Sequence, residues 1–378
     1  MYKWNIKEID ELYKKYKKMA DSSNNIEIKR KYTEICDYLI YLLEYYFTYL
    51  EKDSVVTPYD NNVPSFRAVI KDDLKIIKGY GMYAPLFRNF NNQFDGLVIN
   101  NPDNLQHIKT SPAGIVDMSN SFFQNFKGKF YDTYSEIAKK FPTHLQFRKL
   151  SNNYDSCGNT HIVRHTKMVY IDIGKNNTLQ DYISHIHESS HAISALLNPE
   201  IMWDYNKYCF NEVDSLFFEM IGIDYVGTRI NREDDALAIK RDTFIDYLYC
   251  AMLVCVKLDM YNTLNRDDLS NKRKVKCFYK KELDNDKIAV NNICTTYIHE
   301  MWHYVISYLT AVELYYIYMK DEEKALDLLY KIIMLKGLSK EEYLNKVRDL
   351  GIRFGEHIKD YYTLIFDDKI GKSYGKKI

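Results

Sequence analysis

The segment 178–197 constrains the fold most, because it carries the signals of one long and largely apolar helix. Thr178 is a suitable N-cap, and Asp181 follows three residues later in a pattern close to a capping box. The dipeptide Asn198-Pro199 supplies a stop signal at the other end. Apolar residues recur at helical spacing, so much of this helix is expected to be buried: Ile183, Ile186, Ile193, Leu196 and Leu197.

Two histidines, His187 and His191, stand four residues apart inside this helix. Residues at that spacing share one helix face, so both imidazole rings can converge on a single ion. Glu188 lies one step around the helix from His187, close enough to reach a water at that ion without ligating it. The pattern His-Glu-x-x-His is therefore a candidate zinc site, although ordinary surface or core histidines also occur at this spacing.

Two glutamates follow on the next predicted helix, residues 210–226. A catalytic zinc takes three protein ligands and keeps one position open for water, so the histidine pair needs a third ligand. Glu212 has the placement at which one large group of zinc hydrolases supplies that ligand. Glu219, two turns later, is a candidate for orienting one of the ligand histidines without itself binding the metal. The alternative interpretation is a pair of solvated helix glutamates.

The same motif recurs from His299 to His303, with Glu300 between them. The first copy is favoured, because it follows a predicted strand and a capped helix start, whereas the second lies inside a long helix. If the first copy holds the metal, His299, Tyr304 and Tyr308 become candidate donors to the negative charge that peptide hydrolysis builds on the carbonyl oxygen. His303 is the alternative to His299 in that role.

The composition narrows the class of protein. The 52 basic and 52 acidic residues balance, so bulk charge indicates neither nucleic-acid nor membrane binding. Gly and Pro are scarce, at 14 and 7, which favours long helices. The N-terminus lacks an apolar signal core and no apolar run is long enough to span a bilayer. The cysteines are scattered without a Cys-x-x-Cys pair, which predicts free thiols in the cytoplasm: Cys36, Cys157, Cys209, Cys250, Cys255, Cys277 and Cys294.

The remaining periodicity predicts a mostly helical protein with a small β-sheet beside the motif helix. We expect short strands at residues 161–165 and 168–173, the second of which is a candidate for pairing with a substrate backbone. Residues 271–286 are expected to form an exposed loop or a helix start, and residues 54–125 carry a mixed signal. Further helices are predicted at 5–20, 26–52, 126–141, 233–262, 288–319, 322–335, 339–349 and 352–366.

From about Met168 to the C-terminus, the order of these features resembles the thimet oligopeptidase and oligoendopeptidase F family of zinc metallopeptidases, which are of the gluzincin type. The resemblance rests on the strand at 169–173, the motif helix, the pattern Glu212-x-x-Ser215-x3-Glu219, and the later His and Tyr segment. It implies that zinc is bound by His187, His191 and Glu212. It also implies that Glu188 is the general base and acid, and that His299, Tyr304 and Tyr308 contact the oxyanion and the substrate backbone.

The resemblance further implies a zincin-like catalytic domain at 151–378 and a helical lobe at 1–150, flanking a channel that admits short oligopeptides. The chain departs from the family at Ser190, where the family usually has Gly, and residues 1–150 match only loosely. The predicted function is zinc-dependent endopeptidase activity. In that mechanism zinc lowers the pKa of a water towards roughly 7, and Glu188 moves its proton to the leaving amine. The alternative is an inactive zinc-binding pseudoenzyme that binds peptides or acts as a scaffold.

Overall fold

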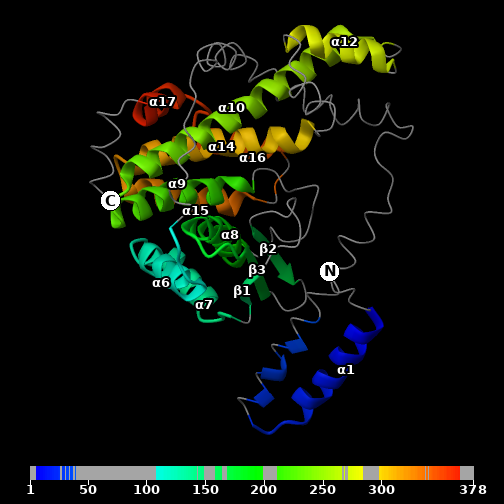
Figure 1. The fold of residues 1–378 in the computed structure, drawn as a ribbon, viewed down its shortest axis with the longest axis vertical. Helices are drawn as coiled ribbons and strands as arrows, with labels where there is room; N and C mark the ends of the chain where they lie inside the picture. Colours follow the sequence, from blue (N-terminus) through cyan, green and yellow to red (C-terminus); the bar gives the residue numbers. More distant parts are fainter. Residues whose placement is uncertain are drawn as a thin grey trace. The chain divides into compact units, whose positions relative to one another are not determined.

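The predicted class, mostly helical with a small sheet, is confirmed by the computed structural model of the chain (Figure 1). Contacts divide the chain into two compact units, residues 1–62 with 104–205 and residues 63–103 with 206–378. The boundary predicted after residue 150 stays a prediction. The structure describes residues 6–25, 108–142, 144–148, 158–163, 168–198, 211–265, 271–283, 298–336 and 340–366, together with a few short stretches between 28 and 39 and the single positions 268 and 338.

The first unit contains a three-stranded sheet. The strands are β1 (Leu145–Arg148), β2 (Gly158–Val163) and β3 (Met168–Gly174), in the spatial order β1-β3-β2. β1 runs parallel to β3, and β2 runs antiparallel to it. The sequence did not predict β1. The expectation that β3 pairs with a substrate is wrong, because β3 is the central strand: it pairs with β2 from Met168 to Ile173 and with β1 from Ile171 to Gly174.

The first unit also has three helices that pack on one another: α6 (Pro112–Phe123), α7 (Lys129–Ala138) and α8 (Leu179–Leu197). α8 contacts β2 and β3 as well as α6 and α7 (Figure 1). The predicted helix at 5–20 is confirmed as α1 (Ile6–Ser22). α6 lies in the region of mixed signal and was not predicted; it begins at Pro112 after Ser111, whose hydroxyl accepts the N–H of Gly114 at 3.0 Å.

The start of α8 differs from the predicted capping box. The Thr178 side chain makes no capping hydrogen bond. Instead, the buried Asp181 carboxylate accepts the backbone N–H groups of Asn176 at 2.9 Å and Asn177 at 2.8 Å, and the Asn176 side-chain amide at 2.8 Å. One carboxylate thus fixes the turn that joins β3 to α8, so the strand and the motif helix are held together locally.

The second unit is helical in its described part. α9 (Glu212–Arg229), α10 (Glu233–Thr263) and α14 (Ile298–Tyr318) pack against one another. α15 (Glu322–Leu335) packs on α14, α16 (Lys340–Asp349) on α15, and α17 (Ile358–Phe366) on α10 and α14. These helices match the predicted ones, except that α17 starts later than the residue 352 expected, after a run of turns.

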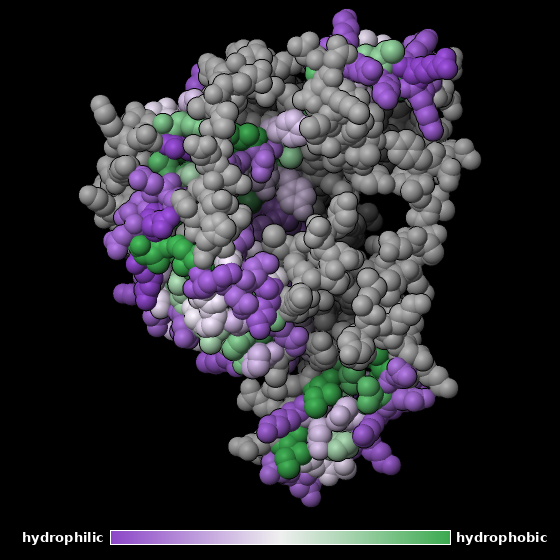
Figure 2. Space-filling model, viewed as in Figure 1, coloured by the Kyte–Doolittle hydropathy of each residue, from purple (hydrophilic) through white to green (hydrophobic). Residues whose placement is uncertain are grey.

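The charged segment near residue 272 forms a helix, α12 (Lys272–Glu282), whose surface is mainly hydrophilic in Figure 2. Its Tyr279 is buried with Leu253, Val256 and Met260 of α10, which ties the helix to the second unit. Within the described ranges, every helix is either too short or too polar to cross a lipid bilayer. The predicted strand at 161–165 is confirmed over residues 161–163, which belong to β2. The helices predicted at 26–52 and 288–297 lie largely outside the described residues.

Candidate functional site

α8 is a largely buried helix whose two motif histidines are partly exposed. From Asp181 to Ala195, every side chain is buried except those of His187 and His191, which are partly exposed. Their ring centroids are 4.9 Å apart and the rings stand at 83° to each other. The helix therefore presents two imidazoles, and little else, on its exposed face.

Glu188 is held by the edge strand β2. It is 9% exposed, and the Thr160 hydroxyl lies 2.7 Å both from its Oε2 and from its backbone oxygen. Gly158 permits the strand to approach this closely, since a Cβ atom there would lie 2.5 Å from Cγ of Glu188 and 2.9 Å from its Oε1. β2 thus fixes the carboxylate next to the histidine pair, which the sequence pattern did not indicate.

Adding a methyl group at Gly158 is expected to destabilise the fold. The Gly158→Ala variant must displace the Glu188 side chain, and overpacking of this kind costs about 1–3 kcal/mol. Gly114→Ala is the matched control, because its nearest heavy atom would be Thr110 Oγ1 at 3.1 Å and Ala stabilises a helix by about 0.5–1 kcal/mol relative to Gly. Urea unfolding of the two variants would measure the difference; equal stabilities would contradict the tight contact.

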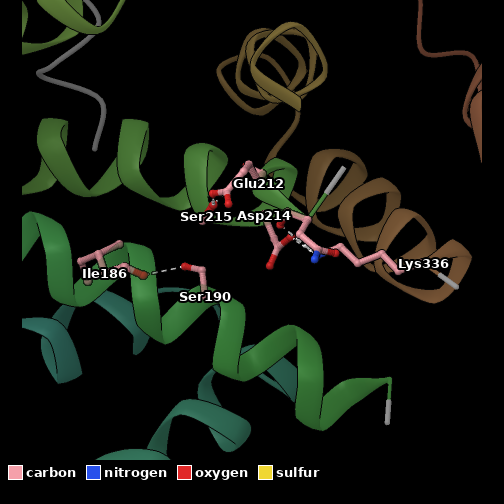
Figure 3. Close-up of polar contacts among 7 residues, drawn as sticks. Ile186, Ser190, Glu212, Asp214, Ser215 and Lys336 are labelled. Atoms are coloured by element: carbon pink, nitrogen blue, oxygen red, sulfur yellow. Dashed lines mark hydrogen bonds and ion pairs between the residues drawn. The ribbon is translucent and has the colours of Figure 1, made fainter. Parts of the chain in front are cut away.

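Ser190, where the resembling family usually has Gly, is accommodated inside α8. Its side chain is fully buried and its hydroxyl donates to the backbone oxygen of Ile186, one turn earlier, at 2.7 Å (Figure 3). A hydroxyl that bonds within its own helix leaves no unsatisfied polar group in the core. The departure at Ser190 therefore needs no rearrangement of the motif helix.

In the second unit, Glu212 begins α9 and is held by a neighbour on the same helix. The Ser215 hydroxyl lies 2.9 Å from Glu212 Oε2 and 3.1 Å from the Glu212 backbone oxygen (Figure 3). Two residues after Glu212, the buried carboxylate of Asp214 forms an ion pair with Lys336, at the end of α15. The first turn of α9 is therefore fixed by polar contacts on both sides of Glu212.

The predicted donors on α14 differ in exposure. Tyr304 is 45% exposed, whereas Tyr308 is buried and its ring stacks on Tyr247 of α10 with 4.2 Å between centroids and 2° between planes. A substrate would reach the Tyr308 hydroxyl only after a rearrangement, so its predicted role stays a prediction. His299 and His303 lie in α14, but their side chains are outside the described part, and the choice between them stays open.

Tyr247 is a candidate that the sequence did not single out. Burial raises its pKa well above the ordinary value, and the negative charges of Glu219 and Glu212 raise it further. Burial likewise raises the pKa of Tyr308. Both phenols therefore stay protonated near neutral pH, and the Tyr247 hydroxyl lies near both glutamates predicted for the site.

Two groups of described side chains have a composition and arrangement suited to a metal ion. One is the predicted set His187, His191 and Glu212. The other is Glu313, Glu356 and His357, where the Glu313 carboxylate already accepts the backbone N–H of His357 at 2.7 Å and lies 2.5 Å from its Nδ1. The second group is explained by the start of α17, which this carboxylate fixes, so the first group remains the metal candidate.

Solved peptidase structures share this fold. A protein described as an oligoendopeptidase F of Bacillus anthracis str. Ames aligns over 93% of this chain and 64% of its own length, with a TM-score of 0.51 and 12% identity. A protein of Chlamydophila abortus described as a peptidase aligns over 93% of this chain and 63% of its own length, with a TM-score of 0.56 and 15% identity. PZ peptidase A with an inhibitor aligns over 98% of this chain and 76% of its own length, with a TM-score of 0.50 and 12% identity. No protein-family model and no curated protein matches the chain.

The resemblance to oligoendopeptidase F, stated above from motifs, is thus confirmed at the level of the fold. At identities of 12 to 15% such a likeness shows the fold alone. The chain spans less than two thirds of the length of the Bacillus and Chlamydophila proteins. Its chemistry therefore has to be argued from the side chains.

Proposed function

We propose that this chain is a zinc-dependent endopeptidase that hydrolyses short oligopeptides. The observation that carries the proposal is the exposure pattern of α8: between Asp181 and Ala195 only the two histidines are partly exposed, and Glu188 is held beside them. An ordinary core helix has no reason to expose two imidazoles on one face and to fix a carboxylate between them. The shared fold with peptidases supports the same class.

The donor set fits zinc. Two imidazoles and one carboxylate are a known ligand set for catalytic zinc, and they leave a position open. His187, His191 and Glu212 would hold the ion, with Ser215 orienting the Glu212 carboxylate. When bound, zinc would lower the pKa of a water towards roughly 7 and polarise the scissile carbonyl.

The other side chains would transfer protons and stabilise the negative charge of the transition state. Glu188 would accept a proton from the attacking water and deliver it to the leaving amine, and its hydrogen bond with Thr160 would keep it in place. Tyr304, Tyr308 and either His299 or His303 would donate hydrogen bonds to the developing oxyanion or the substrate backbone. Glu219 would orient a ligand histidine.

The substrate would add to the sheet at β2. β2 is an edge strand, and a peptide backbone can extend such an edge with little regard to sequence. This replaces the expected pairing with β3. The cytoplasm remains the proposed compartment, and the described residues Cys36, Cys250 and Cys277 form no disulfide.

Removal and return of the metal tests the proposal. Purified protein should cleave an internally quenched oligopeptide, lose that activity after treatment with a chelator, and regain it when zinc is added back. Equilibrium dialysis run alongside separates the alternatives. Zinc binding without cleavage of any peptide in a mixed library would favour the inactive peptide-binding protein, and absence of zinc binding would refute the proposal.

A further inference from the structure

We propose that the buried ion pair between Lys336 and Asp214 is a positioning device for Glu212, and that it sets the affinity of the chain for zinc. This inference rests on the proposed function, because it takes Glu212 to be a metal ligand. It concerns residues that the motifs do not include. Neither residue is proposed to touch the metal or the substrate.

The contacts of Lys336 lie on both sides of Glu212 in the sequence. The exposed fractions of the Lys336 and Asp214 side chains are 3% and 1%, so the pair is sealed from water. The same ammonium group donates to the backbone oxygen of Asn211 at 3.2 Å. Lys336 therefore bonds one residue before Glu212 and one residue two positions after it (Figure 3).

The start of α9 depends on these bonds. Asn211 is the N-cap, yet its side chain makes no capping hydrogen bond, so the usual closure of a first turn is missing. Glu212 is held by Ser215, which belongs to the same first turn. If that turn loosens, Ser215 and Glu212 move together, and the carboxylate loses its fixed direction. Residues that orient a ligand in this way typically change metal affinity by about 10–100-fold.

The same helix offers a matched control. Asp224, further along α9, forms an ion pair with Lys240 of α10, and the exposed fractions of the two side chains are 8% and 6% respectively. Lys240 also lies 3.2 Å from the Tyr315 hydroxyl. Breaking either pair leaves a carboxylate buried without its cation, which is strongly destabilising. The Asp224 pair, however, lies nearly three turns from the first turn of α9, at about 3.6 residues per turn.

The test compares Lys336→Met with Lys240→Met in the full chain. Zinc affinity is measured on metal-free protein by competition with a chromophoric chelator, and stability by urea unfolding. Both variants should have a lower urea midpoint, but only Lys336→Met should bind zinc about 10–100-fold more weakly. Lys336→Arg, which keeps the cation, should recover most of the affinity.

The double variant Asp214→Leu with Lys336→Met covers the case in which the single variant does not fold. Replacing a buried ion pair by apolar groups often restores stability, but the bond to Asn211 would still be missing, so zinc affinity should stay low. Parent-like zinc affinity in Lys336→Met and in the double variant would overturn the inference. Equal losses of zinc affinity in Lys336→Met and Lys240→Met would overturn it as well. A parent protein that binds no zinc would instead refute the proposed function.

Discussion

Replacing Glu188 by Gln is expected to lower turnover of an oligopeptide by about 10²–10⁴-fold, the usual contribution of a positioned general base. A carboxamide cannot accept the proton of the attacking water at neutral pH. The change preserves shape, and the amide oxygen can still accept the Thr160 hydroxyl that lies 2.7 Å from Oε2. The proposed zinc ligands are untouched, so zinc affinity should equal that of the parent. Steady-state kinetics with a quenched peptide, alongside metal analysis, would check both expectations.

The control for this prediction is the second copy of the motif. Glu300→Gln makes the same chemical change between His299 and His303. Its turnover should stay at the parent level if the first copy is the catalytic one. A normal rate in Glu188→Gln would refute the mechanism, and a loss confined to Glu300→Gln would assign the chemistry to α14.

Helices were predictable here because their signals are local. The predicted helix 322–335 coincides with α15, and the predicted motif helix, 178–197, differs from α8 by one residue at its start. In both, apolar residues recur at helical spacing over several turns, and polar caps or stop signals stand at the ends. The segment at 272–282 has many charges and few apolar residues, so its sequence does not distinguish an exposed loop from a helix start.

Strand pairing was less predictable because it joins distant residues. β1 has four residues, too few for a clear alternation, and its partner β3 begins some twenty residues later. Once β1 is present, β3 becomes the central strand, and the edges of the described sheet are β1 and β2, of which we propose β2 for the peptide. A single missed strand therefore changed the expected substrate contact.

The same limit applies to the candidate site. The histidines and Glu188 follow from a motif of five residues, but the side chains that hold the site come from elsewhere. Thr160 bonds Glu188 across 28 positions, and Lys336 bonds Asp214 across 122. Tyr247 could not be singled out, because the chain has 35 tyrosines and no motif includes it. Such contacts leave no periodic pattern in one sequence.

The largest expected effect on stability comes from His185, a buried histidine of α8 outside the motif. Its side chain is fully buried, and Nδ1 lies 2.7 Å from the Ser119 hydroxyl of α6. Burial lowers its pKa from 6.5 to about 3. The unfolded chain therefore binds this proton more readily than the folded chain. The stabilising contribution is complete above pH 6.5 and declines as the pH falls towards 3, by about 1.4 kcal/mol per pH unit.

Comparison with a His185→Gln variant isolates this group, since glutamine does not titrate and the other ionisable groups are shared. Both proteins should be unfolded with urea in the presence of a chelator, so that the proposed zinc binding to His187 and His191 does not contribute. The parent's advantage in free energy of unfolding should shrink by about 2 kcal/mol between pH 7 and pH 5. An advantage that stays constant over this range would show that His185 accepts a proton in the folded state, and that α6 and α8 do not seal it from water.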